Sequence, residues 1–114
     1  MFITQQVDAH NDLELNDWLD IPYDVPWKEW SLETAVNGLE TANLHIVERQ
    51  EASVQMRFYD VGAIIFHVRA IPWQFPGFSV ERYRKHLEVL HQRIMASGYV
   101  QVTSRRFLIL ARKP

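Results

Sequence analysis

The sequence contains no cysteine, few glycines and no long apolar run, and each absence excludes a class of function. Without cysteine, the protein has no disulfide bond, no thiolate chemistry and no cysteine-ligated metal site. No apolar run reaches the roughly 18 residues that a membrane-spanning helix needs. The segment MFITQQVDAHND has neither the basic start nor the apolar core of a signal peptide. We therefore expect a cytoplasmic protein without a membrane partner.

The few glycines and the histidines are spread in a way that excludes two kinds of site. The glycines are too far apart to form the G-x-G turn of a nucleotide cofactor site, since they are Gly38, Gly62, Gly77 and Gly98. The histidines show no metal-ligand spacing on one face, because they stand at 10, 45, 67, 86 and 91. We expect no metal site, and no nucleophile has a base beside it in the sequence.

The residues that are present fit one small globular domain. The chain has 114 residues, of which 47% are hydrophobic and 23% are charged. Residues 1–57 carry 11 acidic and 3 basic side chains, whereas residues 58–114 carry 3 acidic and 9 basic ones. This asymmetry indicates either solvated faces that attract each other weakly or a basic groove for an anionic substrate. The basic residues are not interleaved with aromatic ones, so we expect no nucleic-acid surface.

The spacing of apolar residues predicts strands and helices in alternation. Strand patterns occur at 2–7, 44–48, 54–58, 99–103 and 107–112. The last two form a strand pair or one long bent strand. Helix patterns occur at 13–19, 32–42 and 79–97, with N-caps at Asn11 or Asp12, at Ser31 and at Ser79. Asn43 and Gly98 are the expected helix stops. This order predicts an α/β fold with three to four strands and helices on both faces of the sheet.

The most apolar stretch runs from Phe58 to Phe78. Its valine, isoleucine and phenylalanine content favours a strand. Its length and the N-cap at Asp60 favour a buried helix over 61–71, and periodicity does not decide between the two. The aromatic, proline-containing loop over 21–30 either covers a pocket or fills the core.

Four segments of the sequence carry a family resemblance. FITQQV is similar to a fifth strand, LETAVNGLETANLHIVE to the helix and strand after it, RFYDVGAIIFHVRAIPWQFPGFSVERYRKHL to a helical insertion, and RRFLILARKP to a last, antiparallel strand. Together they resemble the C-terminal half of a bacterial class I S-adenosylmethionine-dependent methyltransferase. The resemblance implies part of a Rossmann-like sheet whose last strand lies antiparallel between the first strand and the middle one.

The resemblance also implies what the chain lacks. S-adenosylmethionine is the cofactor of the intact family, which holds it on a Gly-rich turn after the first strand. That turn and the first four strands have no counterpart in this sequence. We therefore expect this chain alone to bind no cofactor.

Two groups of residues are candidates for contact with a substrate. Ligands of open α/β sheets bind beyond the carboxyl ends of the strands, which predicts a rim formed by Gln5, Gln6, His10 and Asn11. By the resemblance, the helical insertion roofs the substrate, which makes candidates of Tyr59, Asp60, His67 and Trp73. Each has a structural alternative: Asp60 caps a helix, His67 is a hydrogen-bonded core histidine, and the two aromatic residues pack.

These observations support three hypotheses for function. The chain is the substrate-side portion of a methyltransferase for a small molecule, active only with its missing N-terminal half. Alternatively, it is a non-enzymatic module that forms a homodimer through the unpaired edge of its first strand. The third hypothesis is a structural remnant without function.

Overall fold

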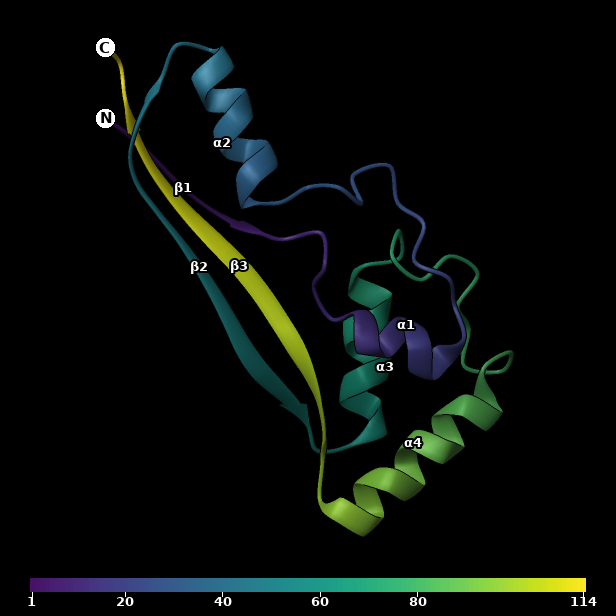
Figure 1. Ribbon diagram of the computed structural model, residues 1–114. Helices are drawn as coiled ribbons and strands as arrows, with labels where there is room; N and C mark the ends of the chain where they lie inside the picture. Colours follow the sequence, from purple (N-terminus) through teal and green to yellow (C-terminus); the bar gives the residue numbers. More distant parts are fainter. The chain divides into compact units, whose positions relative to one another are not determined.

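The computed structural model describes residues 1–114 and alternates strands with helices (Figure 1). The elements in chain order are β1 (Phe2–Val7), α1 (Leu13–Leu19), α2 (Leu32–Thr41), β2 (His45–Phe58), α3 (Val61–Ala70), α4 (Arg84–Ser97) and β3 (Val100–Arg112). The predicted α/β class is confirmed, with three strands and four helices. No helix combines the length and the apolar character that crossing a membrane requires.

The three strands form one sheet in the order β1-β3-β2. β1 pairs with β3 in antiparallel register, from Phe2 opposite Ala111 to Val7 opposite Arg106. Side-chain hydrogen bonds from Gln55 to Thr103 and from Arg57 to Gln101 follow the antiparallel pairing of β2 with β3. The last strand therefore lies antiparallel between the first and the middle one, as the sequence led us to expect. Because β1 and β2 are both antiparallel to β3, they run parallel to each other.

The chain forms two compact units, each with a core of its own. The first unit contains residues 1–11, 26–54 and 104–114, and the second contains residues 12–25 and 55–103. β2 and β3 each contribute residues to both units.

In the first unit, α2 packs on one face of the strands. Its buried residues Leu32, Ala35 and Val36 form a cluster with Phe107, Ile109 and Ala111 of β3. On the other face, Ile3 and Val7 of β1 are 65% and 46% exposed. The expected helices on both faces are therefore wrong for this unit, because α2 is its only helix and covers a single face.

In the second unit, α1, α3 and α4 surround a larger core. Leu15 and Leu19 of α1, Ile64 and Val68 of α3, and Leu87, Leu90 and Ile94 of α4 are buried with Phe58, Phe75, Val100 and Val102. The helix expected over 61–71 is confirmed as α3, but it is not buried all round. Phe66 on its outer side is 78% exposed. Ile21 lies in the same core, so this part of the 21–30 loop fills the core.

Two predicted boundaries differ from the structure. The two strand patterns over 44–58 belong to one continuous strand, β2, whereas those over 99–112 form the single long strand given as one alternative, β3. The helix predicted from Ser79 begins only at Arg84, because residues 80–83 form turns. The Ser79 hydroxyl accepts a hydrogen bond from the Arg82 N–H and so caps that turn.

Every second residue is buried along each half of β3, but the two halves differ in which residues these are. Val100 and Val102 are buried in the first half, whereas Phe107, Ile109 and Ala111 are buried in the second, so the buried positions change from even to odd numbers. The strand itself continues without interruption through residues 104–106.

The predicted helix caps are mostly confirmed. Ser31 and Asp60 each accept a hydrogen bond from the third residue of their helix, at Thr34 and Ala63. Asn43 and Gly98 follow α2 and α4 in the left-handed region, with φ of 67° and 88°. This conformation ends a helix and suits glycine best.

Two glycine substitutions should change stability in opposite directions. Gly98→Ala should lower the free energy of unfolding by about 1–2 kcal/mol, since a Cβ is strained at positive φ. Gly38→Ala should raise it by about 0.5–1 kcal/mol, since Gly38 lies inside α2 with nothing within 4 Å of an added Cβ. Urea unfolding followed by circular dichroism measures both, and equal signs would contradict the assigned backbone conformations.

Candidate functional site

The second unit contains a buried carboxylate paired with a histidine. The Asp12 side chain is 2% exposed, and its Oδ2 lies 2.9 Å from Nε2 of His67, whose side chain is 28% exposed. The Phe58 ring packs edge-on against the imidazole, with ring centroids 5.5 Å apart. The carboxylate and the aromatic ring together fix the orientation of the imidazole.

The backbone of Asp12 explains how this pair forms. Asp12 precedes α1 and adopts the left-handed conformation, with φ 59° and ψ 26°. Its N–H donates to the Thr103 carbonyl, and its own carbonyl accepts from the Leu15 N–H. In this conformation its side chain makes no cap hydrogen bond to α1, and it bonds to His67 instead. Asp12 is therefore the N-cap residue of α1 by position, as predicted, but its side chain does not cap the helix.

One oxygen of this carboxylate has no protein partner. Asp12 Oδ1 is fully buried and accepts no hydrogen bond from the chain. A buried polar atom without a partner costs stability, and such atoms are rare in folded proteins. The arrangement is therefore not the one that stability alone would favour, which marks the pair as a functional candidate. No third histidine or acidic side chain joins it to form a metal-binding group.

Two further contacts hold α1 in place beside this pair. Glu14 Oε2 accepts hydrogen bonds from the backbone N–H and the hydroxyl of Thr103. Asn16 and Gln74, both buried, form a reciprocal amide pair: Asn16 Nδ2 donates to the Gln74 carbonyl, and Gln74 Nε2 donates to Asn16 Oδ1. Asn16 Nδ2 also donates to the Ile21 carbonyl. These bonds fix the helix that follows Asp12.

The four candidates from the apolar stretch have different environments. His67 belongs to the pair with Asp12. Asp60 accepts the Ala63 N–H, so it has the capping role given as its alternative. Tyr59 is 63% exposed and packs edge-on against Tyr99. Trp73 is 55% exposed. Of these four, His67 is the one whose side chain is within hydrogen-bond distance of a carboxylate.

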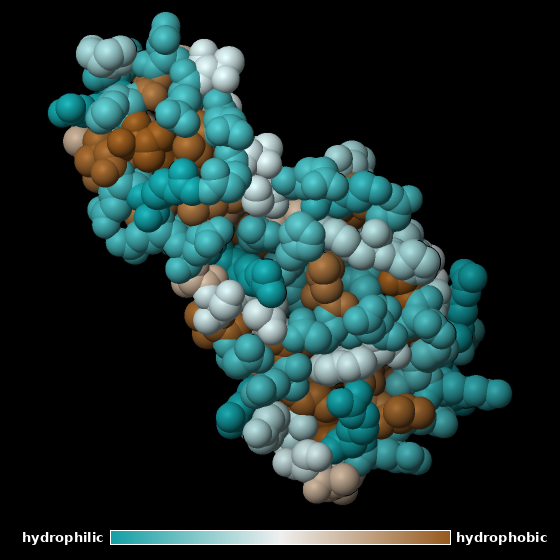
Figure 2. Space-filling model, viewed as in Figure 1, coloured by the Kyte–Doolittle hydropathy of each residue, from teal (hydrophilic) through white to brown (hydrophobic).

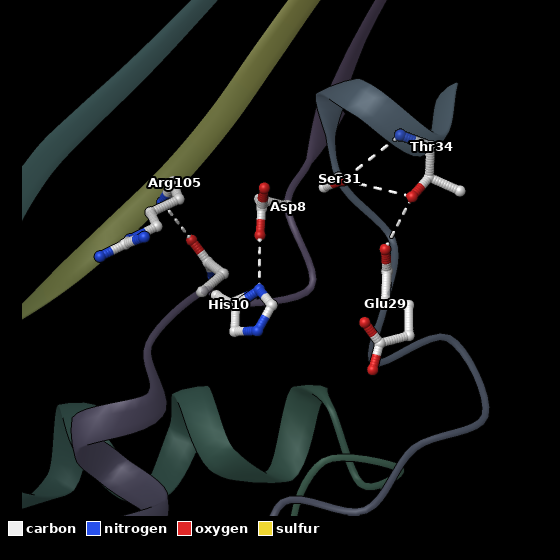
Figure 3. Close-up of polar contacts among 7 residues, drawn as sticks. Asp8, His10, Glu29, Ser31, Thr34 and Arg105 are labelled. Carbon is white, nitrogen blue, oxygen red and sulfur yellow. Dashed lines mark hydrogen bonds and ion pairs between the residues drawn. The ribbon is translucent and has the colours of Figure 1, made fainter. Parts of the chain in front are cut away.

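The four candidates from the predicted rim lie in the first unit, and Figure 3 shows the contact of His10 with Asp8. His10 Nδ1 is 3.2 Å from Asp8 Oδ1, and the Asn11 side-chain oxygen accepts the Arg105 N–H. Gln6 accepts a hydrogen bond from the Trp30 indole N–H. Gln5 is exposed on β1.

The sequence reasoning missed Asp12 as a site residue and missed the Asn16–Gln74 pair. Aspartate before a helix is typical of an N-cap, and the partner of Asp12, His67, is 55 residues away in the sequence. One signal was available: the segment NDLELN places polar side chains at every second residue between leucines. A short helix with two buried leucines cannot direct all of those polar groups into solvent, so some of them must find buried partners.

Comparison of the chain with protein-family models gives no match, and comparison with curated proteins gives none either.

A double-mutant cycle tests whether this pair interacts in solution. We expect Asp12→Asn and His67→Gln each to destabilise the fold, and the double variant to cost less than the two together by about 1 kcal/mol. The control cycle is Asp8→Asn with His10→Gln, a pair whose histidine side chain is 53% exposed and whose coupling should be near zero. Strictly additive effects at Asp12 and His67 would contradict the contact.

Proposed function

We propose that this chain is the substrate-side portion of an S-adenosylmethionine-dependent methyltransferase. The strand order carries the proposal, because the last strand in the sequence lies between the first and the middle one and antiparallel to them, which is the position that the resemblance implies. The helices α3 and α4 between β2 and β3 also match the implied position of a helical insertion.

The position of Asp12 and His67 along the chain supports a role in substrate binding. Asp12 is on the segment that follows β1, and His67 is on α3, which follows β2. β1 and β2 are the two parallel strands, and open α/β sheets bind ligands beyond the carboxyl ends of such strands.

His67 would hold a polar group of the acceptor molecule. Asp12 binds Nε2, which leaves Nδ1 of a partly exposed ring to accept a hydrogen bond or a proton from a hydroxyl or an amine. The carboxylate fixes the orientation of the ring, and a general base must be held in such a defined position within hydrogen-bond reach of the proton it accepts. The geometry therefore fits an acceptor that bears an ionisable N–H or O–H group.

The residues of this chain do not fit the cofactor itself. The family's turn needs glycines between a strand and the helix after it, and the only glycine in such a place is Gly62 of α3. An added Cβ at Gly62 would lie 3.2 Å from the Asp60 carboxylate, which already caps that helix, so no open cradle remains. We therefore assign cofactor binding to a separate cofactor-binding half.

Isothermal titration calorimetry with S-adenosylmethionine tests this proposal. The 114-residue chain should show no binding, whereas the polypeptide extended in frame by a Gly-rich strand–turn–helix half should bind it. In that longer protein, His67→Gln should leave cofactor binding unchanged and lower kcat by about 10²-fold or more, since a positioned base contributes that much. His10→Gln is the matched control and should retain activity. Failure of the longer protein to bind S-adenosylmethionine would refute the proposal.

A further inference from the structure

The outer edge of β1 is open and carries no charged residue. β1 has only β3 as a neighbour in the sheet. Its sequence FITQQV contains no charge and no proline, and Phe2, Ile3 and Val7 are 43%, 65% and 46% exposed. Proteins usually protect such an edge with charges, proline or a bulge, because its free backbone groups accept another strand.

The opposite edge of the sheet shows the protection that β1 lacks. β2 has the sequence HIVERQEASVQMRF, which places Glu48, Arg49, Glu51 and Arg57 along the other edge strand. Charges of this kind oppose pairing with a further strand. The two edges therefore differ, and only β1 is suited to accept a partner.

An apolar cleft lies beside this open edge. It has a volume of about 190 Å³ between β1 and α2, and it is lined by residues that include Phe2, Thr4, Gln6, Trp30, Gly38 and Leu39. Gly38 leaves it open, because nothing lies within 4 Å of where its Cβ would be. Figure 2 shows hydrophobic surface on the part of the molecule that carries β1 and α2. A side chain from an added strand could enter here.

We propose that a second copy of this chain binds at this edge, with the two β1 strands antiparallel across a twofold axis. Side chains of even-numbered and odd-numbered residues of β1 lie on opposite faces of the sheet. For α2 to lie on the same side of the joined sheet in both copies, even-numbered residues of one β1 must therefore lie opposite even-numbered residues of the other. Centring the pair on Thr4 opposite Thr4 places Phe2 of one copy opposite Gln6 of the other. Phe2 then lies beside the cleft lined by its partner's copies of Gln6 and Trp30.

Electrostatics favour a second copy as the occupant. Self-pairing brings no charged side chain opposite another along FITQQV. Asp8 follows β1, and Arg112 of β3 lies next to Ala111, the residue opposite Phe2. An antiparallel partner therefore brings its Asp8 toward the end of the strand pair where Arg112 lies. This proposal does not depend on the methyltransferase proposal.

Light scattering coupled to size-exclusion chromatography tests it. The chain should have twice the 13.5 kDa mass of one copy. Thr4→Lys and Thr4→Glu should each raise the dimer dissociation constant by about tenfold or more, because they place like charges directly opposite each other. An equimolar mixture of the two variants should recover the dimer, since opposite charges then face each other.

Val54→Lys is the matched control, because Val54 is 61% exposed on the other edge strand. It should leave the dimer intact. A monomer for the unmodified chain at high concentration would overturn the proposal. So would a dimer that persists with Thr4→Lys, or a mixture of the Thr4 variants that stays monomeric while each variant has folded circular dichroism.

Discussion

The pairing of β3 with both other strands is the constraint on which the fold depends. β1 and β2 have no contact with each other in the sheet order, so β3 supplies every strand-to-strand hydrogen bond. β3 also contributes to both cores, with Val100 and Val102 in one and Phe107, Ile109 and Ala111 in the other. One continuous strand therefore supplies buried residues to both units.

The proposed acceptor site depends on the Asp12–His67 pair. The cores are apolar, and buried polar side chains such as Asn16 and Gln74 bond to each other. One Asp12 oxygen is buried without a partner, as is Nδ1 of His86, while the other Asp12 oxygen bonds to the imidazole of His67. A buried oxygen without a partner costs folding energy, and this cost beside a fixed imidazole is the reason why we propose a role for the pair in acceptor binding.

The sequence predicted most elements but fewer of the relations between them. Helices α1 and α2 followed from apolar spacing, and α3 was favoured over a strand only by its length and by the Asp60 cap, which are local signals. The late start of α4 was missed, because Ser79 is a good cap and only the turn over 80–83 competes with it. The central position of β3 came from the resemblance, since no local pattern encodes strand order.

The candidate site was only half visible in the sequence. His67 stood out because it interrupts an apolar run. Asp12 did not, because its left-handed backbone removes it from the capping role that its residue type suggests. The pairing of the two joins residues 55 positions apart, and periodicity carries no information at that separation.

The amide pair of Asn16 and Gln74 has a consequence for conformational uniqueness. Gln74 belongs to a segment that contains Pro72, Pro76 and Gly77, and its N–H donates to the Ile71 carbonyl in a turn. The prolines restrict the backbone of this segment but do not decide how it lies against α1. A shift of the segment along α1 would leave buried donors and acceptors of both amides unpaired, which raises the energy of the misaligned states. The pair thus favours a single alignment of this segment against α1.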